Sequence, residues 1–343
     1  MDEHWKRRLD EVRAGLVREG DPVAWVTEAD AVEAVVRYPR LAVRGSLFGV
    51  VARDAEEGSP WRVVLPVQAG MPQEARDSLH SKFFFRAKDD TDDRKVRREL
   101  LAAVHVLERK PVDELVVLGT TYRIVRGNEV ARVGDDGLEP PRPTDPEPVF
   151  RVWERQAGAR GCLDTGAVLD PEKARGLMAE ALRIGLREFH YAGKRYPAAV
   201  RADSRKAVAT HPDIAMLPVG FGVVERSGDV WQPQGSLSPT PHEARRGLYT
   251  CLTDLWGRLY EWDDAQRERY RRAGELFRAA QRADEVRVDG REFRICRVER
   301  MVRFGPDGPE GPRPSDIDEY GPTKMHPRMD EDGVVYHGED AEE

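Results

Sequence analysis

Cysteine is scarce in this chain of 343 residues, which has only Cys162, Cys251 and Cys296. An odd, scattered set of three does not provide the disulfide framework of a small secreted domain. Long apolar runs are lacking too, because no stretch approaches the roughly 20 residues that a membrane-spanning helix needs. The first residues carry charges with no apolar stretch behind them, so no signal peptide is expected. We therefore predict a cytoplasmic protein with no membrane partner.

The sequence also lacks the short signatures of common catalytic and cofactor sites. It contains no Walker loop for phosphate, no dinucleotide-binding glycine motif after a strand and no nucleophile elbow. Its eight histidines show no metal-ligand spacing. We predict no metal and no cofactor. Whether the protein is an enzyme stays open, and a non-catalytic role is favoured.

A basic excess is a third feature that is lacking. The net charge is −7, and residues 318–343 account for all of it with nine acidic and two basic side chains. The remaining residues 1–317 are balanced in charge, whereas proteins that bind nucleic acid usually show a basic excess. The composition therefore argues against nucleic acid as a partner.

What the sequence does contain is an internal repeat. Residues 113–145 align without a gap to residues 284–316, at an offset of 171, with 16 identities in 33 positions. The match extends upstream with small gaps, as far as Pro39 with Pro212. We predict two copies of one unit, over 1–146 and 165–317, with a connector at 147–164 and an acidic C-terminal tail at 318–343.

Each repeat shows the same order of secondary-structure signals. An amphipathic helix is expected over 2–18, and its counterpart in the second repeat is expected to start at Asp170-Pro171. In the two repeats respectively, the other expected elements are a short helix (28–37; 203–210), two strands (46–53 with 61–67; 219–226 with 229–233), a helical pair (72–88 with 93–109; 241–260 with 264–281) and a hairpin (114–118 with 121–133; 285–288 with 291–304). This order predicts an α+β fold, with an antiparallel sheet and helices in each repeat and a pseudo-twofold axis between the repeats.

Arginines that recur at equivalent positions are the candidate binding residues. A strand face rich in arginine can bind carboxylate or phosphate groups through two hydrogen bonds at once. The same residues could instead form salt bridges within the fold or line a solvated strand edge. The candidates are Arg76, Arg123, Arg126, Arg142 and Asp145 in the first repeat, and Arg245, Arg294, Arg297, Arg313 and Asp316 in the second.

Two proline-rich segments are the most distinctive motif. Pro-Arg-Pro-Thr-Asp at 141–145 is here called the first strap, and Pro-Arg-Pro-Ser-Asp at 312–316 the second strap. Proline stiffens the backbone, and the Thr, Ser and Asp side chains can cap their own chain. Arg142 and Arg313 would then be held on stiff segments. Each strap either locks a sheet or forms a recognition surface.

The second strap and the residues around it carry a resemblance. Residues 300–316 read Arg-Met-Val-Arg-Phe-Gly-Pro-Asp-Gly-Pro-Glu-Gly-Pro-Arg-Pro-Ser-Asp. They are followed by Lys-Met-His-Pro at 324–327 and by Met-Asp-Glu-Asp-Gly at 329–333. This segment resembles an uncharacterised actinobacterial protein family of the streptomycete type. The resemblance implies a cytoplasmic actinobacterial protein and transfers no catalytic residue.

These observations favour a non-catalytic module for protein interaction or assembly. Its arginine-bearing faces would bind a protein partner, either another protein or a second copy of the chain, and the acidic tail is a candidate for what they bind. One alternative is an enzyme or ligand-binding protein with a site between the repeats, whose first suspects are His190, Tyr191, His211 and Asp213 because they occur in one repeat alone. The other alternative is a nucleic-acid accessory protein.

Overall fold

A computed structural model describes residues 22–56, 58–149, 152–153, 163–172, 176–228 and 230–336. The helix predicted over 2–18 and Cys162 lie outside the described residues. The first half contains α2 (Pro22–Arg37), β1 (Arg40–Asp54), β2 (Arg62–Ala69), α3 (Pro72–Asp89), α4 (Arg94–Leu107), β3 (Glu114–Val117), β4 (Thr120–Gly134) and β5 (Gly137–Leu138).

The second half contains α5 (Leu177–Leu186), α6 (Ala198–Thr210), β6 (Asp213–Ser227), β7 (Val230–Ser238), α7 (Pro241–Thr250), the π-helical turn η1 (Cys251–Leu255), α8 (Trp256–Leu259), α9 (Asp264–Ala279), β8 (Glu285–Val288), β9 (Arg291–Gly305) and β10 (Gly308–Pro309). The tail adds β11 (Arg328–Met329) and β12 (Val335–Tyr336). The predicted α+β class is confirmed. From α2 and α6 onward the two halves follow the same order of elements, and the duplication itself remains our inference from the aligned residues.

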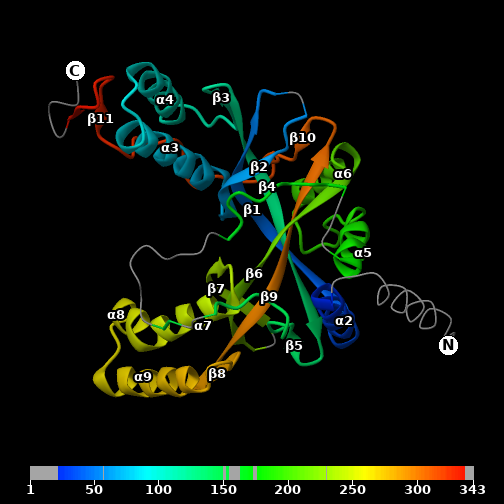
Figure 1. Ribbon diagram of the computed structural model, residues 1–343. Coiled ribbons are helices and arrows are strands. Elements are labelled where there is room, and N and C mark those ends of the chain that lie inside the picture. The colour runs from blue at the N-terminus through cyan, green and yellow to red at the C-terminus, as the bar shows by residue number, and fades with distance from the viewer. Residues whose placement is uncertain are drawn as a thin grey trace.

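One antiparallel sheet of ten strands runs through both halves. Its main order is β2-β1-β4-β9-β6-β7, and the halves meet where β4 pairs with β9. That pairing is short, from Gly127 opposite Val302 to Val130 opposite Glu299. The long strands cross at the centre of the molecule (Figure 1). The sheet is therefore shared between the halves.

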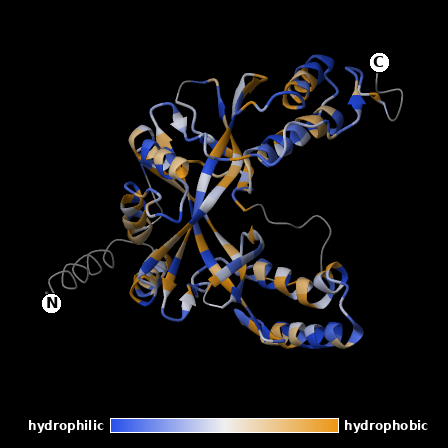
Figure 2. Cartoon of the chain, turned by 180° about the vertical axis from the view of Figure 1, so that it is seen from behind, coloured by the Kyte–Doolittle hydropathy of each residue, from blue (hydrophilic) through white to orange (hydrophobic). Residues whose placement is uncertain are grey.

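Side chains alternate between the two faces of the sheet along each strand, so each face packs into a separate hydrophobic core. In β4, Tyr122 and Ile124 point toward α3 and α4, whereas Val125 points to the other face and packs with Val302. We call α3 with α4 lobe one, and α7, η1, α8 and α9 lobe two. Both lobes project from the same side of the sheet, and α2, α5 and α6 lie on the opposite side of the molecule (Figure 1). Seen from behind, hydrophobic residues concentrate along the crossing strands (Figure 2).

One predicted helix start is wrong. Asp170 does not cap a helix, because its carboxylate accepts the Glu172 N–H at 2.8 Å in a local turn. Helix α5 begins at Leu177, after Gly176, and the Glu28 carboxylate of α2 accepts the free N–H groups of Leu177 and Met178. A residue 149 positions away thus supplies the cap that the local sequence does not.

The predicted two-residue turn after β8 is confirmed. Asp289 and Gly290 have φ values of 49° and 76°, which suit a tight hairpin turn. The helix predicted over 241–260 is interrupted by η1 and ends at Leu259. Strand β1 begins at Arg40, earlier than the predicted position 46, because its N-terminal residues pair with β4.

Candidate functional site

The candidate residues in the central strands form ion pairs between the halves. Arg126 in β4 donates from Nε to Asp316 of the second strap at 2.9 Å, and Arg297 in β9 donates from Nε to Asp145 of the first strap at 3.0 Å. All four side chains are largely buried. The backbone N–H of Arg126 also bonds the Glu310 carbonyl, as that of Arg297 bonds Glu139. Each strap therefore closes over the central strand of the other half.

Arg123 and Arg294 likewise bind groups of the opposite half. Arg123 donates to the carbonyls of Asp307 and Pro309, and Arg294 donates to the equivalent carbonyls of Asp136 and Leu138. The guanidinium of Arg123 lies 4.9 Å from the ring centroid of Trp61, and that of Arg294 lies 4.8 Å from Trp231. These arginines thus hold the turn of the opposite half against a tryptophan.

The strap arginines point inward as well. Arg142 donates to Glu139 at 2.6 Å, and Arg313 donates to Glu310 at 2.7 Å. Asp30 of α2 accepts the hydroxyl and N–H of Thr144, and Asp203 of α6 accepts the N–H of Ser315. Each strap is thus held by the ion pair of its arginine and by a carboxylate of a nearby helix. The strap arginines therefore do not form an exposed recognition surface.

Arg76 and Arg245 each join two carboxylates. Arg76 on α3 binds Asp113 at 2.7 Å and Asp318 of the tail at 2.7 Å. Arg245 on α7 binds Asp284 at 2.7 Å and Glu147 of the connector at 2.5 Å. Burial disfavours the charged form of Arg76, but its hydrogen bonds to Asp318 and Asp113 outweigh this and raise the pKa of the guanidinium. In both lobes, a buried arginine fastens an extended segment to a helix.

The tail lies along lobe one. Its Tyr320 hydroxyl donates to Asp77 at 3.0 Å, and its His326 ring stacks on Phe84 with centroids 4.4 Å apart. Met329 is buried in the core of lobe one. Arg97 of α4 donates to the Glu331 carbonyl at 3.0 Å, while Arg94 pairs with the Glu331 carboxylate. We call this tail-holding surface of α3 and α4 the lobe-one surface.

The described residues of the connector contact lobe two in a similar way. After Glu147, the Trp153 ring packs edge-on against Tyr249 and Phe277. Glu147 and Asp318 are equivalent at the offset of 171, as each follows its strap. Each lobe therefore receives the chain that leaves the strap of the other repeat, and each receives it at a buried arginine.

A fully buried ion pair was missed by sequence reasoning. Arg300 donates to Asp164 at 2.6 Å, and both side chains have no solvent exposure. Arg300 also donates to the carbonyls of Val67 and Pro218, and so links β2 of the first half to β6 of the second. Arg300 stands where the first repeat has Glu129, and this asymmetry in the alignment is the signal that could have singled it out.

The suspects for an enzyme site do not converge. His190 is exposed, Tyr191 is buried in hydrogen bonds to Gly45 and Asn128, and His211 and Asp213 each face an ion-pair partner of their own. Among the residues that the structure describes, no group of three or more His, Cys, Asp or Glu side chains is placed to hold a metal ion.

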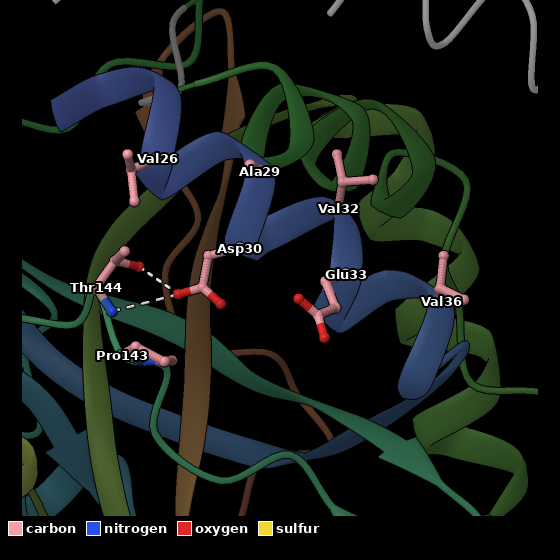
Figure 3. A pocket seen from close by; sticks show the side chains of 8 residues that line it. All are labelled: Val26, Ala29, Asp30, Val32, Glu33, Val36, Pro143 and Thr144. Carbon is pink, nitrogen blue, oxygen red and sulfur yellow. Dashed lines mark hydrogen bonds between the residues drawn. The ribbon is translucent and has the colours of Figure 1, made fainter. Parts of the chain in front are cut away.

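A shallow hollow of about 560 Å³ lies between α2 and the first strap (Figure 3). Its lining is mainly aliphatic, with two carboxylates, of which Asp30 accepts the Thr144 hydroxyl at 2.6 Å. No histidine, cysteine or lysine lines it, so it holds no pair of nucleophile and base. Within the described part of the chain, no helix is both long and apolar enough to cross a bilayer.

Comparison with known proteins adds one match. Comparisons with curated proteins and with solved structures found no match. The model of DUF5954, described as a family of unknown function, matches residues 21–319. This range includes both lobes and both straps, and it confirms the resemblance to an uncharacterised family, while the actinobacterial origin stays a prediction. The chain belongs to the DUF5954 family.

Proposed function

We propose that this protein is a non-catalytic interaction module whose lobe-one surface binds an extended acidic segment of a partner protein. The observation that carries the proposal is the shared use of Arg76 and Arg245. Each of these buried arginines joins a carboxylate of its own lobe to a carboxylate on an extended segment. Lobe one is thus suited to hold an acidic peptide, and the tail is its built-in occupant.

The contacts of the tail define the chemistry of the partner segment. Asp318 accepts the Gln73 N–H at 2.6 Å and Arg76 Nη1 at 2.7 Å, so a carboxylate sits at the N-terminus of α3. A negative charge is stabilised there by the helix dipole and by charge-assisted hydrogen bonds. His326, eight residues later, stacks on Phe84. A partner segment therefore needs a carboxylate and, about eight residues on, a planar ring.

The resident tail sets the affinity that a partner must exceed. Because the tail belongs to the same chain, it competes at a high effective concentration. Its hydrogen bonds with α3 come from Asp318, Tyr320 and His326, and a segment of similar chemistry can replace them. The tail of a second copy would satisfy the same contacts, so self-association is an outcome of the same test.

The experiment measures peptide binding to the full-length protein. A fluorescent peptide of residues 317–336 is titrated into wild type and into Asp318→Arg, and anisotropy is recorded. Asp318→Arg places a cation beside Arg76 and weakens the resident tail. We expect the peptide to bind Asp318→Arg at least about tenfold more tightly than wild type, because the resident tail then covers the lobe-one surface less of the time.

Matched variants locate the binding site. Arg76→Gln, added to Asp318→Arg, should weaken peptide binding by at least about tenfold, since it removes the buried cation. Arg245→Gln in the same background removes the equivalent pair of contacts from lobe two and should leave the peptide affinity unchanged. Equal binding to all these proteins, or equal losses from Arg76→Gln and Arg245→Gln, would exclude the lobe-one surface as the binding site.

A further inference from the structure

Helices α2, α5 and α6 form one face of the molecule, on the side opposite the lobes, with α5 between the other two (Figure 1). Helix α5 carries an apolar stripe on this face. Leu177 and Ile184 are 40% and 54% exposed, Ala181 between them is exposed as well, and their spacing of four and three residues puts them on one helix face. Leu182 and Leu186, on the other side of α5, are buried against the sheet. The stripe of α5 therefore faces away from the sheet.

Helices α2 and α6, which lie on either side of α5, are equivalent in sequence. At the offset of 173 that relates Pro39 to Pro212, Asp30 of α2 corresponds to Asp203 of α6. Asp30 accepts hydrogen bonds from the first strap, and Asp203 accepts one from the second strap. The two helices therefore lie next to equivalent straps, and the side chains on their outer surfaces can be compared position by position.

The outer surfaces of α2 and α6 carry opposite charge. Helix α2 contains three acidic residues and one basic residue, whereas α6 contains three basic residues and one acidic residue. Glu33 of α2 corresponds at the same offset to Lys206 of α6, and both side chains are exposed. Neither side chain makes a hydrogen bond or an ion pair with another residue that the structure describes. An unpaired anion and an unpaired cation thus stand at equivalent positions of two similar helices.

The outer surfaces of α2 and α6 also differ in the size of their apolar residues. Val26 and Val36 of α2 are 49% and 69% exposed, and together with Glu33 they line the hollow beside the first strap (Figure 3). The corresponding residues of α6, Ala199 and Ala209, are small and exposed. A lysine on such a surface can reach into the hollow toward Glu33, while its aliphatic stem packs against the two valines. In size as in charge, the outer surface of α6 complements that of α2.

We propose that this face is a homodimer interface, in which α2 of each copy packs on α6 of the other and Glu33 pairs with Lys206 of the second copy. Twofold symmetry produces this contact twice, once in each direction, and closes the assembly at two chains. Because α5 lies between α2 and α6, the same symmetry places its apolar stripe opposite the stripe of the second copy. The dimer thus covers the exposed apolar residues of α2 and α5 together. The proposal does not depend on the lobe-one surface or on the tail.

Sedimentation velocity of the full-length protein over a concentration series tests the dimer. Wild type should form a dimer. Glu33→Lys and Lys206→Glu should each raise the dissociation constant of the dimer at least about tenfold, because each places like charges opposite each other in both α2–α6 contacts. A wild type that stays monomeric up to its solubility limit, or variants that dimerise as tightly as wild type, would overturn the proposal.

A mixture of the two variants tests which helices meet. In a dimer of one Glu33→Lys chain and one Lys206→Glu chain, both α2–α6 contacts again join opposite charges. The mixture should therefore dimerise with an affinity close to that of wild type, although each variant alone dimerises weakly. A contact of α2 with α2 would instead leave Lys206→Glu unaffected, and a head-to-tail assembly would form species larger than a dimer. Either result, or a mixture that dimerises no better than the separate variants, would overturn the proposal.

Matched variants control for the charge changes and test the stripe of α5. Asp92→Lys makes a similar charge reversal in the exposed loop between α3 and α4 and should leave the dimer unchanged. Ile184→Asp should raise the dissociation constant at least about tenfold, because it buries a carboxylate in the interface. Leu259→Asp, at an exposed apolar residue of lobe two, should not. Equal losses from Ile184→Asp and Leu259→Asp, or from Glu33→Lys and Asp92→Lys, would overturn the proposal.

The variant with a weakened tail separates this dimer from self-association through the tail. Asp318→Arg removes the carboxylate that binds Arg76 and leaves the face of α2, α5 and α6 as it is. The dissociation constant of the dimer should therefore be the same in Asp318→Arg and in wild type. A dimer that is lost in Asp318→Arg would place the tail in the interface and overturn the proposal.

Discussion

Arg126 and Asp316 are 190 residues apart in the chain and form a buried ion pair, with Arg126 Nε 2.9 Å from Asp316 Oδ2. Their sequence counterparts Arg297 and Asp145 form the same pair in the opposite direction. Because each strap closes over the strand of the other half, the two pairs tie the halves to each other at the place where β4 meets β9. Separation of the halves would break both pairs at once.

Asp316→Asn should destabilise the protein strongly, because it leaves the buried Arg126 guanidinium without its counterion, which costs roughly 3–5 kcal/mol. Asp145→Asn should cost less, because Arg297 keeps Glu299 as an ion-pair partner. Urea unfolding measures the loss. The control is Asp289→Asn in the exposed pair with Arg269, which should cost less than about 1 kcal/mol. Losses no larger than that of the control would mean that the exchanged straps do not hold the halves together.

Arg300 and Asp164 should behave as a coupled pair. Arg300→Met and Asp164→Leu each leave one fully buried charge unpaired, so each should cost roughly 3–5 kcal/mol. The double variant leaves no unpaired charge. Its loss in free energy of unfolding should therefore be about 1–3 kcal/mol smaller than the sum of the two single losses. A double-mutant cycle from urea unfolding measures this coupling. Additive losses would show that the pair contributes no coupling across the halves.

Docking of the tail should weaken in mild acid. Burial, and then the nearby His80, lower the pKa of His326, whereas Glu108 opposes the shift. With a lowered pKa in the folded state, the contribution of His326 is present above the ordinary histidine pKa of about 6.5 and is lost as the pH falls through the lowered value. Exchange protection of residues 325–336, corrected for intrinsic rates, should therefore decrease between about pH 7.5 and about pH 5.

His326→Phe provides the control for this pH effect. Phenylalanine can keep the stacking on Phe84 and does not titrate. Protection of the tail in this variant should depend less on pH than in wild type. An equal pH dependence in the two proteins would mean that His326 is not the group responsible.

Gly308→Ala should destabilise the protein more than Gly290→Ala. Both glycines have positive φ, at 111° and 76°, so alanine is strained at either, by about 1–2 kcal/mol. A Cβ at Gly308 would also lie 2.7 Å from Trp61 Nε1, whereas at Gly290 it would meet nothing within 4 Å. We expect an additional loss of about 1–3 kcal/mol for Gly308→Ala, measured by thermal unfolding. Equal losses would mean that the Trp61 side chain can move away from the added Cβ without a loss of stability.

The sequence alone determined the α+β class, the order of elements and the hairpin turn at Asp289 and Gly290. It also allowed that the candidate arginines form salt bridges within the fold, as Arg76 does with Asp113. These features depend on periodicity, capping and turn residues that act over a few positions. The start of α5 was not predictable in this way, because its cap comes from Glu28 in the other half.

Only the tertiary structure decided which strap binds which strand. Each repeat carries an equivalent Arg, a strap and an Asp, so Arg126 can pair with Asp145 or with Asp316 as far as local chemistry is concerned. Pairing of β4 with β9 brings Asp316 to Arg126 and Asp145 to Arg297. The choice depends on contacts between residues far apart in the chain, whose geometry exists only once both halves have folded.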